Sequence, residues 1–370
     1  MFAPRAIGEV RNAHLRPPSD HNVPMRAAVY RRFGGPEVVR IEELSKPRPR
    51  RGEVLINVRA STVSAADYRA RTKDVPKGLK LVTSIALGFF VPRFRVLGMD
   101  VAGVVEEVGA DVAGFRPGDE VIAMLGSRFG GHAEYVTVQQ GSALTAKPRN
   151  MTFEDAAALV FGGITARALL SQVQLAPGAS VLVNGASGAV GTAAVQLAHL
   201  AGSRVTAVCS APNSDLAHSL GANRVIDYTR TDFTQETNVY DLVIDCVGNA
   251  TFEQLEPLIK PNGALVSVIS DLTGVINARS RSRRTGKRII AGNVTYLSGD
   301  LADVARLAST GRFLPVIDKI YDLTAIAEAH RYVDTGRKRG NVVVRVTASP
   351  MPGPNAASII NIPVTPSVIS

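Results

Sequence analysis

Short apolar runs alternate with amphipathic segments through the middle of the chain. The run at 181–183 has the composition of a buried strand, and apolar positions within 189–200 recur at helical spacing. Strands and helices that alternate at these lengths predict a doubly wound parallel sheet, so we expect an α/β fold. Further strand patterns lie at 204–209, 224–227, 240–246 and 263–269, with a helical pattern around 213–220.

The first part of the chain has a different pattern, in which short β-prone runs are separated by turn residues. Turn signals such as Pro117-Gly118-Asp119 between these runs predict a partly open β-barrel-type domain. A helix is expected at 152–172, where Thr152 can act as the N-cap. The β-prone runs lie at 26–30, 53–59, 102–109, 120–123 and 132–138, and the chain continues after the parallel sheet with helical patterns at 302–310 and 323–335 and a strand at 341–346.

These patterns divide the chain into five segments. Prolines and weak periodicity predict a disordered extension at 1–24, with ordered structure from Met25, and a Pro- and Ser-rich composition predicts a disordered tail at 347–370. Between them we expect a β-barrel-type domain at 25–150, a doubly wound α/β domain at 151–298 and a closing segment at 299–346.

Charge adds a question about partners. The chain has 370 residues and a formal net charge of +10, and its densest basic run is 279–288, with no acidic residue between Asp271 and Asp300. We expect a solvated loop at this run, with an anion or acidic-partner site as the alternative. No aromatic residue lies among these arginines to stack on bases, so we expect no nucleic-acid partner.

Two features bear on the compartment. The longest apolar run, at 79–92, is shorter than the roughly 20 residues of a membrane helix, so no membrane span is expected. We interpret this run as a core helix, a pocket lid or a contact surface, in that order. The two cysteines, Cys209 and Cys246, lie in predicted buried strands and cannot form a disulfide framework, which predicts a cytoplasmic location.

A glycine-rich turn follows the strand at 181–183. Gly185 and Gly188 let backbone approach a pyrophosphate, and Gly191 lets the following helix pack closely on the sheet. The start of that helix offers free N–H groups and the positive end of a helix dipole to an anion. The turn therefore predicts a dinucleotide site and redox chemistry, with Ala186, Gly188, Ala189, Val190 and Gly191 as cofactor-binding residues.

Several motifs together resemble the medium-chain dehydrogenase/reductase superfamily over residues 25–346. This resemblance implies a GroES-like β-barrel-type domain, a doubly wound Rossmann domain and a C-terminal return to the first domain. The motifs are GMDVAGVVEEVG at 98–109, FRPGDEV at 115–121, GHAEY at 131–135, GITA at 163–166, NGASGAVGTAAVQL at 184–197 and GRKRGNVV at 336–343.

Within that superfamily, the zinc alcohol dehydrogenases would carry a cysteine near Ser64 and a Gly-His-Glu where this chain has Gly98-Met99-Asp100. Both ligand positions are lost and the four-cysteine zinc lobe is absent, so we expect no metal. His132 and Asp100 remain only as lone possible ligands. The chain is most similar to the NADPH-dependent, zinc-independent quinone oxidoreductases.

The cofactor can be argued from one position. An NAD-specific Rossmann site places a carboxylate about 20 residues beyond the glycine turn, and here that place is Ser210, so no carboxylate is expected to repel a 2′-phosphate. Ser210 and Asn213 can bind the phosphate, and Tyr228 resembles the family's adenosine-pocket tyrosine. NADPH is therefore favoured, with its counter-charge left open. The resemblance implies nicotinamide contacts from Thr165, Val247, Gly248, Val268 and Ile269.

The resemblance also bears on the proton donor. Aligning the family's shared aspartate on Asp67 puts Ser64 where the family has Asn and Tyr68 one position before its Tyr. Tyr68 is the candidate acid, with Ser64 and Asp67 as its catalytic neighbours; a core or pocket-lining role is the alternative for Tyr68, and water or another hydroxyl is the alternative donor.

The resemblance implies hydride transfer from NADPH to a small apolar quinone, enone or related carbonyl. We expect Leu79, Leu81, Phe89 and Phe90 to form one wall of the substrate cleft. An NAD(P)-dependent alcohol dehydrogenase or enoyl reductase is one alternative, and a non-catalytic NADPH-binding interaction protein is another. We also expect a homodimer joined through an apolar, β-prone edge strand at 288–297, because soluble proteins pair or cover such edges.

Overall fold

The structure, a computed structural model, describes residues 23–292 and 294–346. The tail expected at 347–370 and nearly all of the extension expected at 1–24 lie outside the described residues. The first strand begins at Pro24, one residue before the expected start. Within the described ranges, no helix has the length and apolar character needed to cross a membrane.

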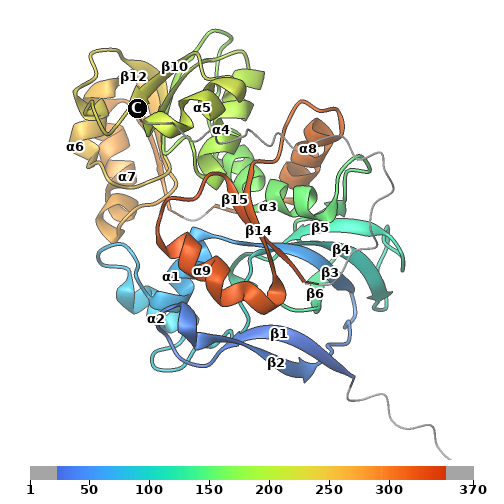
Figure 1. The fold of residues 1–370 in the computed structure, drawn as a ribbon. Helices are drawn as coiled ribbons and strands as arrows, with labels where there is room; N and C mark the ends of the chain where they lie inside the picture. Colours follow the sequence, from blue (N-terminus) through green and yellow to red (C-terminus); the bar gives the residue numbers. More distant parts are fainter. Residues whose placement is uncertain (1–22, 293, 347–370) are drawn as a thin grey trace, which may run out of the picture.

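A parallel sheet of six strands forms one half of the molecule (Figure 1). Its strand order is β10-β9-β8-β11-β12-β13, so the order reverses between β8 and β11. The strands are β8 (Ser180–Asn184), β9 (Arg204–Cys209), β10 (Arg224–Asp227), β11 (Tyr240–Asp245), β12 (Ile259–Ser267) and β13 (Arg288–Ala291).

Both faces of this sheet are buried. Successive residues of one strand belong to different cores: Val181 and Val183 pack on one face and Leu182 on the other, as the alternation of side chains along a strand requires. A doubly wound sheet needs helices on both sides, which confirms the expected class. The helices of this half are α4 (Ala189–Leu200), α5 (Ser214–Ser219), α6 (Phe252–Leu255), α7 (Leu272–Thr285) and α8 (Ser298–Ser309).

The other half is built on a mainly antiparallel sheet of seven strands, in the order β14-β15-β3-β4-β5-β7 with β6 also paired to β3. The last strand pairs with an early one, Val342 opposite Val63, so the chain returns to its first half as expected. The strands are β3 (Glu53–Val63), β4 (Asp100–Val108), β5 (Glu120–Met124), β6 (Tyr135–Gln139), β7 (Leu144–Ala146), β14 (Ile317–Asp322) and β15 (Asn341–Arg345). A separate hairpin is formed by β1 (Pro24–Tyr30) and β2 (Val39–Ser45). The helices of this half are α1 (Ala65–Thr72), α2 (Lys80–Leu87) and α9 (Ile326–Asp334).

Helix α3 (Phe153–Leu170) joins the two halves. It begins where expected, because the Thr152 hydroxyl accepts a hydrogen bond from the Asp155 N–H at 3.1 Å. Twelve of its residues are buried, and they belong to the cores of both halves. A helix that is buried all round lies inside a protein, and Figure 1 accordingly shows α3 in the middle of the molecule.

Three local expectations were wrong. The run at 79–92 is not a core helix, because α2 contains no buried residue. The basic run is not a loop, because most of it lies in α7, which ends at Gly286 with φ +70°. The expected edge strand at 288–297 is only four residues long, β13 (Arg288–Ala291). In each case the composition of the segment does not show whether other elements of the fold cover it.

Candidate active site

The glycine-rich turn lies between β8 and α4, beside the point where the strand order reverses. Gly185 has φ +77°, and a Cβ on Gly191 would lie 2.0 Å from the Gly185 carbonyl oxygen, so both positions require glycine. Around Gly188, the N-cap of α4, the atom nearest to an added Cβ is 3.6 Å away. The turn is therefore packed tightly on its sheet side and open at Gly188, where the first N–H groups of α4 lack intrahelical acceptors.

The C-terminal segment touches this turn. The Gly340 N–H donates to the Ser187 carbonyl at 2.7 Å, and the Lys338 Nζ donates to the Gly340 carbonyl at 2.6 Å. Desolvation lowers the pKa of Lys338 to about 8, although the charge of Asp318 opposes that shift. A lysine amine is thus held next to a turn that suits phosphate.

The turns after β11 and β12 meet at the other side of the glycine loop. The Asp245 carboxylate accepts hydrogen bonds from the Val247 and Gly248 N–H groups, both at 3.0 Å, while its carbonyl accepts one from Val268. A Cβ on Gly248 would lie 3.2 Å from the side chain of Ile269. The structure thus brings the four expected nicotinamide contacts of these turns together.

At the adenosine end, the Ser210 hydroxyl accepts a hydrogen bond from the Asn213 amide at 3.0 Å. Asn213 Oδ1 is buried without a hydrogen-bond partner in the described part of the chain. Tyr228, at the end of β10, is 58% exposed. These three expected residues therefore lie at the ends of two neighbouring strands, with one polar atom left for a ligand.

One expectation at this end was wrong, since a carboxylate does lie close to Ser210. Strand β10 places Asp227 opposite Cys209 of β9. There the Asp227 carboxylate accepts a hydrogen bond from the backbone of Ala211. Hydrogen bonds from Thr229, together with the charge of exposed Arg230, hold the pKa of Asp227 below its usual range. The pairing of the two strands creates this proximity, which position 210 alone could not reveal.

Thr165 lies on α3 at the junction of the halves, where it is 3% exposed. Its hydroxyl donates to the Tyr296 hydroxyl at 3.4 Å. The Tyr296 ring is also the nearest group to a Cβ on Gly126, in the loop after β5, at 4.0 Å. Burial raises the pKa of Tyr296, so the phenol keeps its proton at neutral pH.

The three candidate catalytic residues lie together at the start of α1. Ser64 and Asp67 form a capping box in which the Ser64 hydroxyl donates to Asp67 at 2.6 Å, and the other Asp67 oxygen accepts the Gly98 N–H at 2.8 Å. The Tyr68 hydroxyl donates to Asp74 at 2.7 Å, which raises the pKa of Tyr68. Ser64 and Asp67 thus fix α1 against the loop before β4, and Tyr68 is bonded to a surface acid.

Asp100 and His132, the lone possible metal ligands, are buried in the first half. Asp100 accepts hydrogen bonds from Thr62, at 2.7 Å from its N–H and 2.6 Å from its hydroxyl, and burial raises its pKa to about 7. His132 Nε2 lies 3.0 Å from the Thr62 carbonyl. No group of three His, Cys, Asp or Glu side chains suited to a metal occurs in the described ranges.

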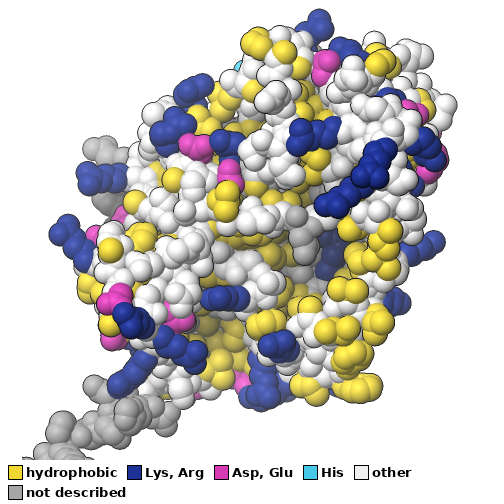
Figure 2. Space-filling view, turned by 180° about the vertical axis from the view of Figure 1, so that it is seen from behind, with side chains coloured by type: hydrophobic (Ala, Val, Ile, Leu, Met, Phe, Trp, Pro, Cys, Tyr) yellow, Lys and Arg dark blue, Asp and Glu magenta, His cyan; other side chains and the backbone are white. Residues whose placement is uncertain are grey.

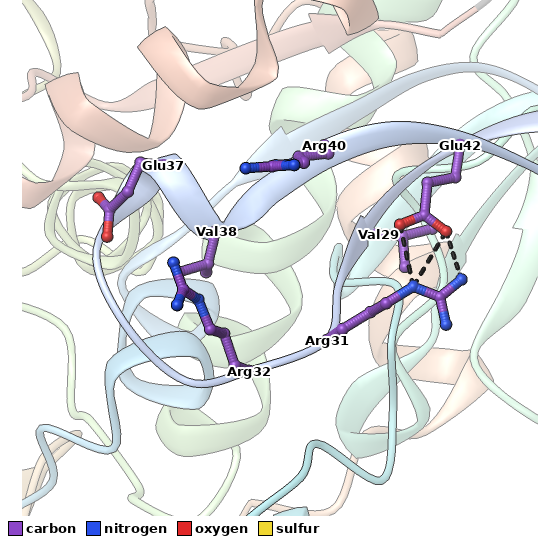
Figure 3. Close-up of a pocket in the computed structure, with 7 residues that line it drawn as sticks. All are labelled: Val29, Arg31, Arg32, Glu37, Val38, Arg40 and Glu42. Carbon is purple, nitrogen blue, oxygen red and sulfur yellow. Dashed lines mark hydrogen bonds and ion pairs between the residues drawn. The ribbon is translucent and has the colours of Figure 1, made fainter.

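An open cavity of about 340 Å³ lies on the β1–β2 hairpin, away from these groups (Figure 3). Two of its lining residues, Arg31 and Glu42, form an ion pair at 2.5 Å. Its lining residues all belong to the hairpin and its connecting turn, so it is separate from the glycine loop.

Comparison with known proteins shows which family this chain belongs to. Residues 50–149 match the family described as alcohol dehydrogenase GroES-like domain, and residues 220–344 match the family described as zinc-binding dehydrogenase. The chain is 30% identical to the quinone-oxidoreductase QR1 of Triphysaria versicolor, over 86% of this chain and 98% of that protein. The chain belongs to the medium-chain dehydrogenase/reductase superfamily. It is an oxidoreductase of the quinone oxidoreductase-like branch.

Two further members of the superfamily agree. The chain is 31% identical to an NADPH-dependent alkenal/one oxidoreductase of Arabidopsis thaliana, over 92% of this chain and 84% of that protein. The solved quinone oxidoreductase of Coxiella burnetii superimposes with a TM-score of 0.79 at 28% identity, covering 88% of this chain and all of that one.

Sequence reasoning missed three polar residues that this superfamily fold brings to the site. Lys338, Arg230 and Tyr296 lie far apart along the chain, at the phosphate turn, the adenosine end and the junction of the halves. Lys338 could have been found from the sequence, because it lies inside the closing motif at 336–343. The other two reach the site only through strand pairing and packing.

Proposed function

We propose that this oxidoreductase uses NADPH to reduce an electron-poor carbon of a quinone, enone or related conjugated carbonyl, without a metal. The observation that carries the proposal is the glycine loop itself, open at Gly188 and closed at Gly185 and Gly191. Relatives named as quinone and alkenal reductases support the substrate class. Bound NADPH would supply the hydride.

The chain's own residues bind and orient the reactants. The start of α4 binds the pyrophosphate, with Lys338 as a nearby cation. The turns that carry Val247 and Ile269 would hold the nicotinamide in an apolar setting that excludes water, and Thr165 would contact it. On the adenosine side, Ser210 and Asn213 would bind the 2′-phosphate, and Arg230 would supply a counter-charge that offsets part of the Asp227 charge.

For the proton we propose two candidates. Tyr68 remains one, with Ser64 and Asp67 positioning its helix. Tyr296 is the second, and it is favoured because its hydroxyl lies 3.4 Å from Thr165, whereas the Tyr68 hydroxyl is already bonded to Asp74. A quinone acceptor needs such an acid less than a simple enone does, because its reduced anion is delocalised.

The test is a turnover assay of NADPH oxidation with a panel of quinones, enones and simple ketones, before and after exhaustive chelation. Turnover of conjugated acceptors that survives chelation is expected. NADPH binding with no turnover of any acceptor would favour the non-catalytic binding protein, and activity lost with bound zinc would favour the alcohol dehydrogenase. A cytoplasmic location belongs to the proposal and is tested by cell fractionation.

A further inference from the structure

Helix α2 and the loop after it carry a large exposed apolar surface. Leu81, Ile85 and Phe90 are 64%, 63% and 91% exposed. Val82, Phe89 and Val91 are each more than half exposed as well. Soluble proteins keep such continuous patches for contacts, whereas single exposed apolar residues need no explanation.

The start of α7 extends this surface. The Leu272 N–H donates to the Lys77 carbonyl at 3.1 Å, and Gly78 packs against the Leu272 side chain. The first turns of α7 then expose Val275 and Ile276, at 37% and 66%. We call residues 77–95 and 272–288 together the α2–α7 face. Figure 2 shows hydrophobic side chains gathered over α2 and Lys and Arg side chains over the neighbouring α7.

The charge on this face has one sign. No acidic residue occurs between Asp74 and Asp100 or between Asp271 and Asp300. Lys77, Lys80 and Arg93 are exposed beside the apolar residues of α2. On α7, Arg281 pairs with Glu253, but Arg279, Arg283 and Arg284 are exposed and form no ion pair within the described ranges. The two segments of the face therefore carry cations only, and the neighbouring Glu253 and Glu256 neutralise just Arg281 and Lys287.

We propose that the α2–α7 face docks on an anionic lipid surface. Exposed apolar side chains enter the boundary between headgroups and acyl chains, and Lys and Arg next to them attract anionic headgroups. A second copy of the chain fits this face less well, because like charges would meet. A protein partner would have to be both apolar and acidic, and the strong projection of Phe90 suits insertion better than a flat contact.

Vesicle flotation tests this inference with the full chain and two vesicle compositions, phosphatidylcholine alone and phosphatidylcholine with phosphatidylglycerol. The chain should float with the anionic vesicles only, and added salt should release it. Two variants separate the contributions: F89S/F90S removes apolar groups, and R279Q/R283Q/R284Q removes charge. Each should weaken binding about tenfold or more: the charge variant loses attraction to anionic headgroups, and F89S/F90S loses the apolar groups that enter the acyl boundary.

The matched control is R204Q/R306Q/R312Q, which removes the same charge from exposed positions outside the face and should bind like the parent. Thermal melting checks that every variant folds. Equal binding to neutral vesicles, equal loss in the control, or no flotation of the folded parent would each overturn the proposal. Light scattering that shows self-association abolished by F89S/F90S would assign the face to a second copy instead.

Discussion

Ser210 and Asp227 favour opposite cofactors from neighbouring strand ends. A hydroxyl at the end of β9 would admit a 2′-phosphate, whereas the Asp227 carboxylate beside Ala211 would repel it. Arg230 lies close enough to Asp227 to lower its pKa and offsets part of that charge. The balance at this site is therefore set by charges that only the folded chain brings together.

We predict that the parent protein binds NADPH about tenfold more tightly than NADH and that Ser210→Asp reverses this order. The added carboxylate would repel the phosphate and accept hydrogen bonds from the ribose hydroxyls of NADH. Titration of both cofactors by fluorescence measures the two affinities. Ser210→Asn, which adds no charge, is the control, and NADH-favouring affinity in the parent would refute the assignment.

Lys338 predicts a pH dependence of cofactor affinity. Its lowered pKa, about 8, means that the amine is protonated below that pH and attracts a phosphate, whereas above it the neutral amine does not. Affinity should therefore fall as pH rises through about 8, and Lys338→Met should remove the dependence. Calorimetric titration from pH 6.5 to 9.5 would show this; an unchanged pH profile in the variant would exclude Lys338.

The two candidate acids can be separated by kinetics. Tyr296→Phe should lower kcat for a simple enone about 10²-fold, a typical loss for a general acid, and should lower it less for a quinone. Tyr68→Phe should change kcat little, because its hydroxyl already donates to Asp74. The kcat–pH profile is the second readout, since loss of the acid should remove its alkaline limb. A larger loss in Tyr68→Phe would restore the assignment made from the family motif.

At the scale of elements, the glycine loop offers a matched pair. Gly191→Ala should destabilise the protein by about 1–3 kcal/mol, because its Cβ would overlap the Gly185 carbonyl and push α4 from the sheet. Gly188→Ala should leave the melting temperature nearly unchanged, because no atom lies within 3.6 Å of the new Cβ, yet weaken cofactor binding by occupying the phosphate side. Thermal melts with and without NADPH separate these outcomes, and equal destabilisation would contradict the division of roles.

Elements with strong local signals were predictable from the sequence. The strand, turn and helix around Gly185 carry their own spacing, and Thr152 carries its own cap, so both were placed correctly. Helices α2 and α7 were misjudged because an apolar or basic run does not say whether another element covers it. Asp227 and Tyr296 were not assigned to the site from the sequence, because strand pairing and packing decide which residues lie next to them. The sequence thus predicted the fold and the local structure of the glycine loop better than the charged and acidic groups around it.

At the scale of the whole molecule, the two halves are tied at several distant points. Helix α3 contributes to both cores, the closing strand β15 pairs with β3, and the Asn341 amide donates to the Ala158 carbonyl at 3.0 Å. These ties run close to the glycine loop through Gly340. Cofactor binding at the loop is therefore expected to stabilise both halves together.

The homodimer remains a prediction, and the structure sharpens how it can be tested. Strand β13 is the last strand of the parallel sheet, but its Ile289 N–H already donates to the Ser282 hydroxyl of α7 at 2.9 Å. Because N–H directions alternate along a strand, the Ala291 N–H should point outward like that of Ile289 and stay available to a partner strand.

Ala291→Pro should therefore weaken a dimer without breaking the ladder to β12, because proline removes only that donor. Ala291→Ser keeps the donor and is the control. The exposed arginines of α7 adjoin β13, so two copies would bring like charges together and salt should tighten the pair. Light scattering across a salt series at micromolar concentration measures this. A monomer throughout would refute the dimer, and a dimer unaffected by Ala291→Pro would move the interface away from β13.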